Sequence, residues 1–252
     1  LYQRIMQLSV VIITYNEEKN IERCLKSVLP LTDDIVVVDS FSTDRTEKIC
    51  ANYNVRFYKR EFKGYSDQKN FANTLAKYDY IFSIDADEAV SPELAASILN
   101  ADCTHSKQVF WVNRMTNYCG KWIHHCGWYP DRKERIWNRN TGMWTGHIHE
   151  KPAFNCEVHH TSIHGDLLHY SYYHIDEHYR QSEKFARMKA EELHFNGRKS
   201  HYITLIFAPF FRFLSVFIFK LGFLDGKYGF IIAKISARAT FLKHKWLLIL
   251  EK

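Results

Sequence analysis

Three continuous apolar runs in the first hundred residues indicate the class of fold. They are LSVVIIT at 8–14, IVVVD at 35–39 and YIFSID at 80–85. Runs of this length that are rich in β-branched residues and bounded by polar residues are typical of strands buried on both faces of a parallel sheet. Amphipathic helix patterns alternate with them at about 17–29, 43–53 and 66–77. This alternation predicts an α/β fold in which helices flank the sheet.

The pattern changes after residue 100. Residues 107–170 contain short alternating stretches such as QVFWVNR and ERIWNR, which predict short, partly antiparallel strands and loops. Residues 174–196 are charged and have a helical period, and apolar segments follow them. We therefore expect a main domain over residues 6–172 and a helical, membrane-associating C-terminal region over residues 173–252.

The two apolar C-terminal segments, at 203–224 and 230–250, carry basic residues along their length. These are Arg212 and Lys220 in the first segment and Lys234, Arg238, Lys243 and Lys245 in the second. A membrane-spanning helix needs about 20 apolar residues with few charges, so we expect neither segment to cross a membrane. Apolar helices with basic faces are typical of segments that lie in a bilayer interface. The alternative is that they pack against the main domain or in a homodimer.

Composition narrows the setting of the chain. Its 252 residues, of which 46% are hydrophobic, suffice for a sizeable core. Six cysteines form no CxxC pair, which favours reduced thiols in the cytoplasm, and residues 1–7 lack the apolar segment of a signal peptide. The net charge of +6 permits nucleic acid as a partner, but no RRM, zinc-finger or helix-turn-helix signature is present. The basic residues gather in the apolar last third, which favours lipid instead.

The stretch FSIDADEAVSPE at 82–93 carries the strongest chemical signal. Asp85, Asp87 and Glu88 follow a buried strand, while Ser91 and Pro92 have the residue types of a helix N-cap and first turn. Ligands of open α/β sheets bind at this carboxyl edge. Two carboxylates in a D-x-D pattern can bind Mg²⁺ or Mn²⁺ and leave coordination positions for phosphate oxygens. We therefore expect Asp85 and Asp87 to bind a divalent cation.

The ends of the first two strands bring further polar groups to the same edge. The first strand runs into Thr14-Tyr15-Asn16-Glu17, and the second ends at Asp39. A carboxylate such as Asp39 can accept hydrogen bonds from a base or a ribose, and Tyr15 can stack on a base. Helix capping by Asn16 is the alternative use of this loop.

Three motifs in this order, TYNEEKNI, VVVDSFSTDRT and IDADE, resemble the nucleotide-sugar-binding half of family 2 glycosyltransferases, which have the GT-A fold. The resemblance implies an inverting enzyme that uses a nucleotide diphosphate sugar, commonly a UDP-sugar, and Mn²⁺ or Mg²⁺. It implies a set of donor-binding residues: Thr14, Tyr15, Glu17, Asp39, Lys69 and Asp85. It also implies that Asp85 and Asp87 hold the metal, with His169 as a further ligand and His147 as the alternative to it.

Later stretches resemble a subgroup that includes lipopolysaccharide inner-core glucosyltransferases. These stretches are GWYPDRKERIW at 127–137, GHIHEKP at 146–152 and GFLDGKYGF at 222–230. This resemblance implies that glucose is transferred from UDP-glucose to a lipopolysaccharide-core or other lipid-linked acceptor. The enzyme would then be peripheral on the cytoplasmic face of the inner membrane. A polysaccharide or protein acceptor stays open.

An inverting transfer also needs a base beside the acceptor hydroxyl, on the face opposite the leaving diphosphate. That base must be a carboxylate outside the metal pair, and Glu150 in HIHE is the first candidate, with Asp131 the second. Glu88 adjoins the metal pair and is less free. Arg135, together with Arg132, suits a phosphate of the donor or of a phosphorylated acceptor.

Two other enzyme classes share parts of this pattern. A sugar nucleotidyltransferase also binds a nucleotide and a metal, but it usually has a Gly-rich basic loop after the first strand. The corresponding TYNEEKN contains neither glycine nor arginine. A phosphatase with a D-x-D nucleophile usually has a threonine two residues later, where this chain has Ala89. A zinc site formed by His147 and His149 with His124, His125 and Cys126 would match no standard spacing.

Overall fold

A computed structural model describes residues 6–101, 106–146 and 150–251. The chain divides into two compact units. The first unit consists of Leu1–Arg114 and Asp131–His169, and the second of Met115–Pro130 and Tyr170–Lys252. The sequence predicts a division after residue 172, whereas in the structure an internal segment, 115–130, also groups with the C-terminal residues.

The largest sheet has nine strands in the order β3-β2-β1-β4-β8-β6-β11-β5, with β7 paired to β6. Their bounds are β1 Leu8–Thr14, β2 Asp34–Asp39, β3 Arg56–Lys59, β4 Tyr80–Asp85, β5 Glu88–Val90, β6 Gln108–Tyr118, β7 Lys121–Ile123, β8 Asp131–Asn138 and β11 His159–Tyr172. The first four strands along this path are parallel, and β8 is antiparallel to both β4 and β6. A small second sheet pairs β9 (Gly142–Thr145) with β10 (Lys151–Phe154). The predicted α/β fold is confirmed.

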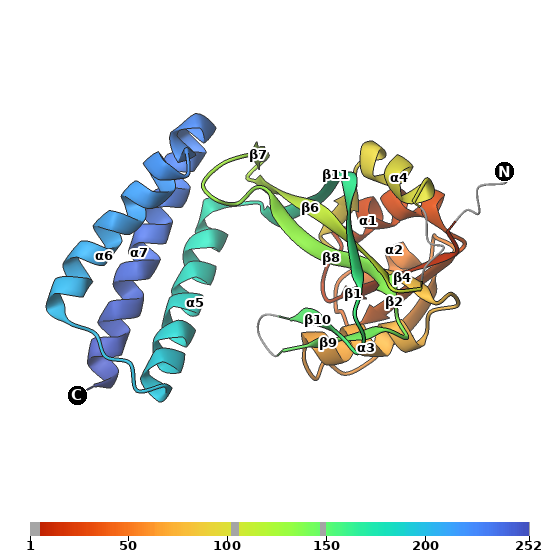
Figure 1. Ribbon diagram of the computed structural model, residues 1–252, viewed down its shortest axis with the longest axis horizontal. Helices are drawn as coiled ribbons and strands as arrows, with labels where there is room; N and C mark the ends of the chain where they lie inside the picture. The colour runs from red at the N-terminus through yellow and green to blue at the C-terminus, as the bar shows by residue number, and fades with distance from the viewer. Residues whose placement is uncertain (1–5, 102–105, 147–149, 252) are drawn as a thin grey trace. The chain divides into compact units, whose positions relative to one another are not determined.

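Helices cover both faces of the parallel strands, as Figure 1 shows for α1 (Ile21–Val28) and α3 (Tyr65–Thr74). Val10 and Ile12 of β1 pack in one core cluster with residues of α1 and of α4 (Pro92–Leu99). Val11, which points to the opposite face, packs in a second cluster with residues of α3. The short helix α2 is Thr46–Cys50. Burial on both faces explains why the strand runs show no polar alternation.

Three helices dominate the second unit, and they lie side by side in Figure 1. They are α5 (Ile175–Phe195), α6 (Tyr202–Leu214) and α7 (Gly226–Leu250). A π-helical turn, Ser215–Phe219, extends α6, and a 3-10 turn, Gly222–Asp225, leads into α7. The buried ring of Tyr118 contacts the rings of Trp128, Tyr172, His178 and Tyr228 edge-on. This aromatic cluster supplies much of the core of the unit.

One helical stretch in the described residues, Tyr202–Phe219, is long and apolar enough to cross a membrane, judged by length and composition alone. The charges of the wider segment predict no crossing, but within this stretch Arg212 is the only charged residue. Only 6% of the stretch is buried. Most of its apolar side chains are therefore exposed or only partly buried.

The motif GFLDGKYGF forms a tightly packed turn between α6 and α7. A Cβ atom on Gly229 would lie 1.7 Å from the carbonyl oxygen of Gly222. Asp225, between the two glycines, is buried, and its carboxylate accepts hydrogen bonds from the backbone amides of His124 at 3.3 Å and His125 at 2.9 Å. The motif thus ties the internal segment 115–130 to the helices of the second unit.

Substituting Gly229→Ala should destabilise the protein by about 2–3 kcal/mol, because the new methyl group would overlap backbone that cannot move aside cheaply. Urea unfolding followed by circular dichroism measures the change. Lys234→Ala, an exposed position on the same helix, is the control and should change the free energy of unfolding by less than about 0.5 kcal/mol. Equal stability of the two variants would contradict the close packing of the turn.

Candidate active site

The carboxyl ends of β1, β2 and β4 meet at one edge of the sheet and open into a cavity of about 670 Å³. The strand register places Thr14 opposite Asp39 and Ile13 opposite Asp85. The cavity is lined by Ile13, Thr14, Tyr15, Glu17, Ser40, Phe41, Glu61, Phe62, Tyr65, Asp85, Ala86, Asp87, Glu150 and His169. Residues far apart in the sequence therefore meet where α/β sheets bind their ligands.

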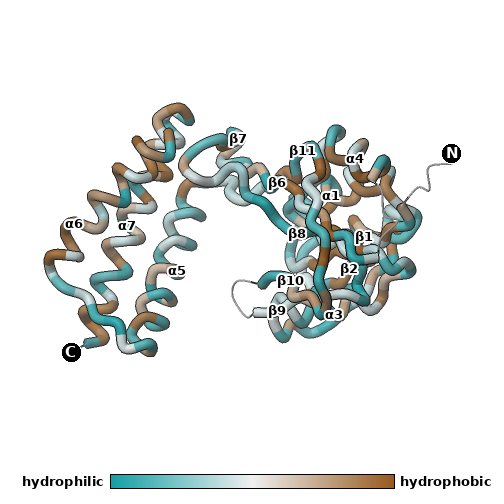
Figure 2. The backbone as a smooth tube through the Cα atoms, in the orientation of Figure 1, coloured by the Kyte–Doolittle hydropathy of each residue, from teal (hydrophilic) through white to brown (hydrophobic). Residues whose placement is uncertain are grey.

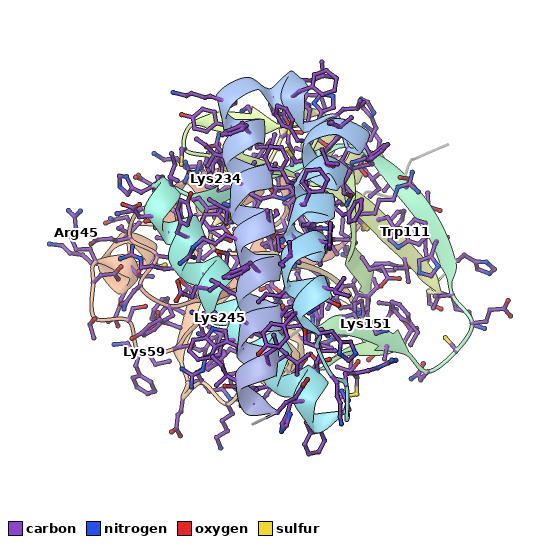
Figure 3. The ribbon with its side chains drawn as sticks, turned by 90° about the vertical axis from the view of Figure 1, so that its left-hand side faces the viewer. Arg45, Lys59, Trp111, Lys151, Lys234 and Lys245 are labelled. Atoms are coloured by element: carbon purple, nitrogen blue, oxygen red, sulfur yellow. The ribbon has the colours of Figure 1, made fainter. Side chains whose placement is uncertain are left out.

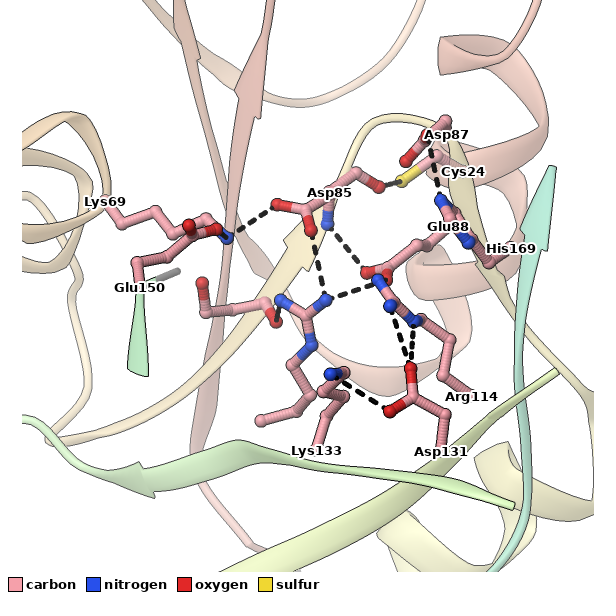
Figure 4. A network of polar contacts seen from close by, with 12 residues as sticks. Cys24, Lys69, Asp85, Asp87, Glu88, Arg114, Asp131, Lys133, Glu150 and His169 are labelled. Atoms are coloured by element: carbon pink, nitrogen blue, oxygen red, sulfur yellow. Dashed lines mark hydrogen bonds and ion pairs between the residues drawn. The ribbon is translucent and has the colours of Figure 1, made fainter. Parts of the chain in front are cut away.

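Asp85 lines the cavity and lies between two cations, Lys69 and Arg135. Figure 4 shows its contact with Lys69. One carboxylate oxygen is 2.9 Å from Nζ of Lys69, and the other is 3.0 Å from Nη2 of Arg135. Burial alone raises the pKa of Asp85, but the charges of Lys69 and Arg135 outweigh it and hold that pKa well below its usual range. Asp85 is therefore ionised, and both of its oxygens already have charged partners.

Glu88 is buried and forms the inner end of the same network. Its carboxylate lies 2.7 Å from Arg135 and 3.5 Å from Arg114, and it accepts a hydrogen bond from the backbone amide of Asp85 at 3.0 Å. Burial lowers the pKa of Arg135, but the charges of Glu88 and Asp85 more than reverse that effect. These contacts hold the backbone of the D-x-D turn in place.

The two candidate bases have different surroundings. Glu150 lines the cavity, and its carboxylate accepts a hydrogen bond from Nζ of Lys69 at 3.1 Å. Asp131 is not one of the lining residues, and it forms ion pairs with Arg114 at 2.8 Å and Lys133 at 3.0 Å. Of the two candidates, Glu150 is the one that lines the cavity.

Asp87 and His169 lie together at the wall of the cavity. Nε2 of His169 is 3.2 Å from the Asp87 carboxylate, because β11 pairs antiparallel with β5 and sets His169 opposite Glu88. Nδ1 of His169 is buried and has no hydrogen-bond partner in the described part of the chain. The alternative ligand His147 lies outside the described residues.

These residues fit a divalent cation only in part. No group of three or more His, Cys, Asp or Glu side chains converges on one point among the described residues. Asp87 and His169 are close enough to share one ion, whereas Asp85 would have to give up a contact with Lys69 or Arg135 to join them. Two protein ligands leave several positions of an octahedral Mg²⁺ or Mn²⁺ for phosphate oxygens and water.

Two of the residues expected to bind the base and the ribose, Thr14 and Tyr15, line the cavity, whereas Asp39 is not among its described lining residues. The hydroxyl oxygen of Thr14 is buried and has no hydrogen-bond partner within the described chain. Asp39 is buried and accepts a hydrogen bond from the backbone amide of Ser42 at 2.8 Å. Tyr15 is 58% exposed, so its ring is available for stacking. The side chain of Asn16 accepts a hydrogen bond from the amide of Thr43 at 2.8 Å, but Asn16 caps neither nearby helix, since Asn20 and Arg45 occupy the N-cap positions of α1 and α2.

Glu17 differs from Asp85 in that its surroundings raise its pKa. Burial raises its pKa from 4.5 to about 7, a hydrogen bond from Asn20 opposes the rise, and the nearby charge of Asp87 adds to it. The side-chain amide of Asn20 donates that hydrogen bond at 2.7 Å. An ionised Glu17 therefore costs free energy in the ligand-free protein.

Sequence reasoning missed an exposed aromatic rim. Phe41, Phe62 and Tyr65 line the cavity, and each exposes about half of its surface. Phe41 has a positive φ of 60°, which is rare for an aromatic residue, and the ring of Phe62 meets that of Tyr65 edge-on at 5.1 Å. Aromatic residues in loops that follow strand ends were the available signal.

Comparison with known proteins identifies the class of this chain. The model of the family "Glycosyl transferase family 2" matches residues 9–159, which is more than half of the chain. The chain belongs to this family, and it is therefore a glycosyltransferase with an α/β sheet of the GT-A kind, as the sequence motifs predict.

Relatives along nearly the whole chain are consistent with this assignment. A glycosyltransferase of Rickettsia prowazekii is 28% identical over 94% of this chain and 85% of its own. The lipopolysaccharide core biosynthesis glycosyltransferase LpsC of Rhizobium meliloti is 27% identical over 95% of this chain and 93% of its own. Among solved structures, TarS of S. aureus is 18% identical with a TM-score of 0.45, and the match covers 88% of this chain and 46% of that one.

Substituting Glu17→Gln should stabilise the protein at pH 8 by about 2 kcal/mol. The folded protein holds a proton on Glu17 more tightly than the unfolded chain does. The stability that this proton confers is complete below pH 4.5 and is lost as the pH rises towards 7. Thermal or urea unfolding across this range measures the effect, and the gain should disappear at low pH.

Glu18→Gln is the matched control for this experiment. Glu18 is partly exposed, and hydrogen bonds from Arg45 lower its pKa, so its replacement should bring no gain at pH 8. An equal gain in both variants would mean that general charge repulsion, rather than burial of Glu17, sets the pH dependence.

Proposed function

We propose that the protein is a metal-dependent, inverting glycosyltransferase that transfers glucose from UDP-glucose to a lipopolysaccharide inner-core or other lipid-linked acceptor. The main support for a bound metal and a diphosphate donor is the negative charge of the cavity lining. No Lys or Arg stands among its described lining residues. Five carboxylates line it: Glu17, Glu61, Asp85, Asp87 and Glu150. A nucleotide diphosphate would be repelled by this wall unless a cation lay between them.

Asp87 and His169 are the residues that would hold this cation. Their contact at 3.2 Å joins an oxygen and a nitrogen ligand, and both side chains line the cavity. Bound Mn²⁺ or Mg²⁺ supplies positive charge where the leaving diphosphate becomes more negative. Asp85 would position the site through Lys69 and Arg135, whose charges lie beneath the same wall.

Glu150 is the proposed base. Its carboxylate takes the proton of the acceptor hydroxyl as that oxygen bonds to the anomeric carbon. The bond from the anomeric carbon to the diphosphate oxygen breaks at the same time, and UDP leaves with the bonding electrons. Attack from the face opposite UDP inverts the configuration. Lys69 contacts both Glu150 and Asp85, and it thereby fixes the base relative to the rest of the site.

The remaining wall suits the nucleoside. Thr14 lines the cavity, and its hydroxyl, which has no partner within the described chain, can form a hydrogen bond with the base. Asp39 lies opposite Thr14 in the strand register but is fully buried, so it would reach the ribose only after a local rearrangement. The exposed ring of Tyr15 can stack on the base. The relationship to LpsC, which is a lipopolysaccharide core enzyme, supports a lipid-linked acceptor and therefore peripheral contact with a membrane.

Calorimetric titration of UDP and of UDP-glucose, in Mn²⁺, in Mg²⁺ and then in EDTA, tests the metal and the donor together. Asp87→Ala should weaken binding of UDP in Mn²⁺ by at least about 10-fold, because it removes a proposed ligand. Asp79→Ala, an exposed carboxylate paired with Arg139, is the control and should bind as the wild type does. If neither EDTA nor the Asp87→Ala substitution changed the binding of UDP, the proposed metal site would be excluded.

The base is tested by a matched pair of isosteric variants. Glu150→Gln should keep binding of UDP-glucose and lower kcat by roughly 10²–10⁴-fold, because the acceptor proton then has no base. Asp131→Asn should keep most of the activity, since Asp131 is engaged with Arg114 and Lys133. The reverse result, in which only Asp131→Asn loses turnover, would move the base to Asp131.

A further inference from the structure

The exposed side of α6 is apolar, the reverse of what a helix on a water-facing surface shows. None of its 13 residues is buried. Its exposed apolar side chains recur with helical spacing and share one face: Tyr202, Ile203, Ile206, Phe207, Phe210 and Phe211. Figure 2 shows the hydrophobic colour along this helix. We call these six residues the α6 stripe.

The stripe continues beyond the helix into the turn that leads to α7. Ile218, Phe219, Leu221, Phe223 and Leu224 are also exposed there, and Phe219 exposes 80% of its surface. So many exposed apolar side chains close together in the sequence are typical of an interaction site.

The residues around the stripe carry a strong positive charge. Residues 202–251 contain seven lysines and arginines but only two acids, Asp225 and Glu251. Asp225 is buried, and Glu251 accepts a hydrogen bond from the backbone amide of Ser200. Lys234 and Lys245 both project from α7 in Figure 3. The partner that covers the stripe must therefore combine apolar and anionic chemistry.

A groove between α5, α6 and α7 concentrates this chemistry. It encloses about 690 Å³ and is lined by basic side chains, hydroxyl groups and apolar rings, with no Asp or Glu among its described lining residues. Arg212 comes from α6 and Lys243 from α7, so two helices bring cations to one groove. Burial lowers the pKa of Lys243, and the charges of Arg212 and Lys189 lower it further. An anion between Arg212 and Lys243 would relieve their repulsion.

We propose that the second unit docks on the surface of an anionic phospholipid bilayer. The groove takes a lipid phosphate between Arg212 and Lys243, and the α6 stripe lies at the boundary between headgroups and acyl chains. This inference deepens the peripheral membrane contact of the proposed function, but it requires neither the donor nor the acceptor named there.

Charge complementarity favours a bilayer over a second copy of the chain. A two-fold contact between two copies would set the same basic residues of each copy against those of the other, and like charges without partners oppose such a contact. An anionic bilayer offers apolar and negatively charged groups in adjacent layers, which matches the stripe and the groove.

Flotation of the full chain with vesicles tests the proposal. The probes are phosphatidylcholine vesicles and vesicles that also contain phosphatidylglycerol. Binding should be stronger to the anionic vesicles and should fall as salt is raised. The double variant Arg212→Gln/Lys243→Gln should lose roughly tenfold in affinity for the anionic vesicles. Phe207→Ser/Phe210→Ser should lose binding even at low salt, because the inserted surface is gone.

Controls on the first unit separate this site from general charge and hydrophobicity. Lys59→Gln/Lys151→Gln removes two exposed lysines, and Met143→Ser removes an exposed apolar side chain. All of these should bind vesicles as the wild type does. Equal losses in these controls, or binding that ignores lipid charge and salt, would overturn the proposal. So would a dimer, measured by sedimentation equilibrium, that Phe207→Ser/Phe210→Ser dissociates in a chain that binds no vesicles.

The outcome is independent of the proposed reaction. Vesicle binding needs no UDP-sugar, so a failure of donor binding leaves this result intact. Loss of vesicle binding in the Arg212→Gln/Lys243→Gln variant with unchanged UDP binding would assign the two functions to separate surfaces.

Discussion

The buried guanidinium of Arg135 is the contact on which the candidate active site depends. It comes from β8 and meets Glu88 of β5 at 2.7 Å and Asp85 of β4 at 3.0 Å. Removing a charge from water costs several kcal/mol, so Arg135 is stable here only with both carboxylates, and the buried Glu88 only with Arg135. This mutual requirement holds three strand segments together. The same network fixes the turn that carries Asp87, because the carboxylate of Glu88 accepts a hydrogen bond from the backbone amide of Asp85.

The parts of the fold that the sequence predicts correctly are those encoded by residues adjacent in the chain. β1, β2 and β4 appear as unbroken apolar runs because both faces of each strand are buried. Parallel strands have their carboxyl ends at the same edge of the sheet. The sequence therefore predicts that Thr14, Asp39 and Asp85 lie close together. The helix at 92–99 was marked by Ser91, whose hydroxyl does accept a hydrogen bond from the amide of Leu94.

The rest depends on pairings between distant segments that no local pattern encodes. His169 reaches Asp87 only because β11 pairs with β5 in one register, and a shift of one residue would turn its side chain to the other face. Lys69 lies on an ordinary helical pattern, yet it is 2% exposed and bonded to Asp85 and Glu150. In the sequence, GFLDGKYGF shows only a resemblance to related enzymes. In the structure its local role is the close packing of Gly222 against Gly229.

In this site the positive charges lie deeper than the carboxylates of the D-x-D motif, and this difference in depth separates the roles of its two aspartates. The cations Lys69 and Arg135 are almost fully buried, while the side chains of Asp85 and Asp87 are each 28% exposed above them. Asp85 neutralises the buried cations from above, which leaves Asp87 without an ion pair to Lys or Arg among the described residues. On the proposed function, a divalent ion on Asp87 and His169 would therefore be the outermost positive charge, next to the diphosphate. The two aspartates of one motif then do different work: Asp85 holds the framework, and Asp87 faces the ligand.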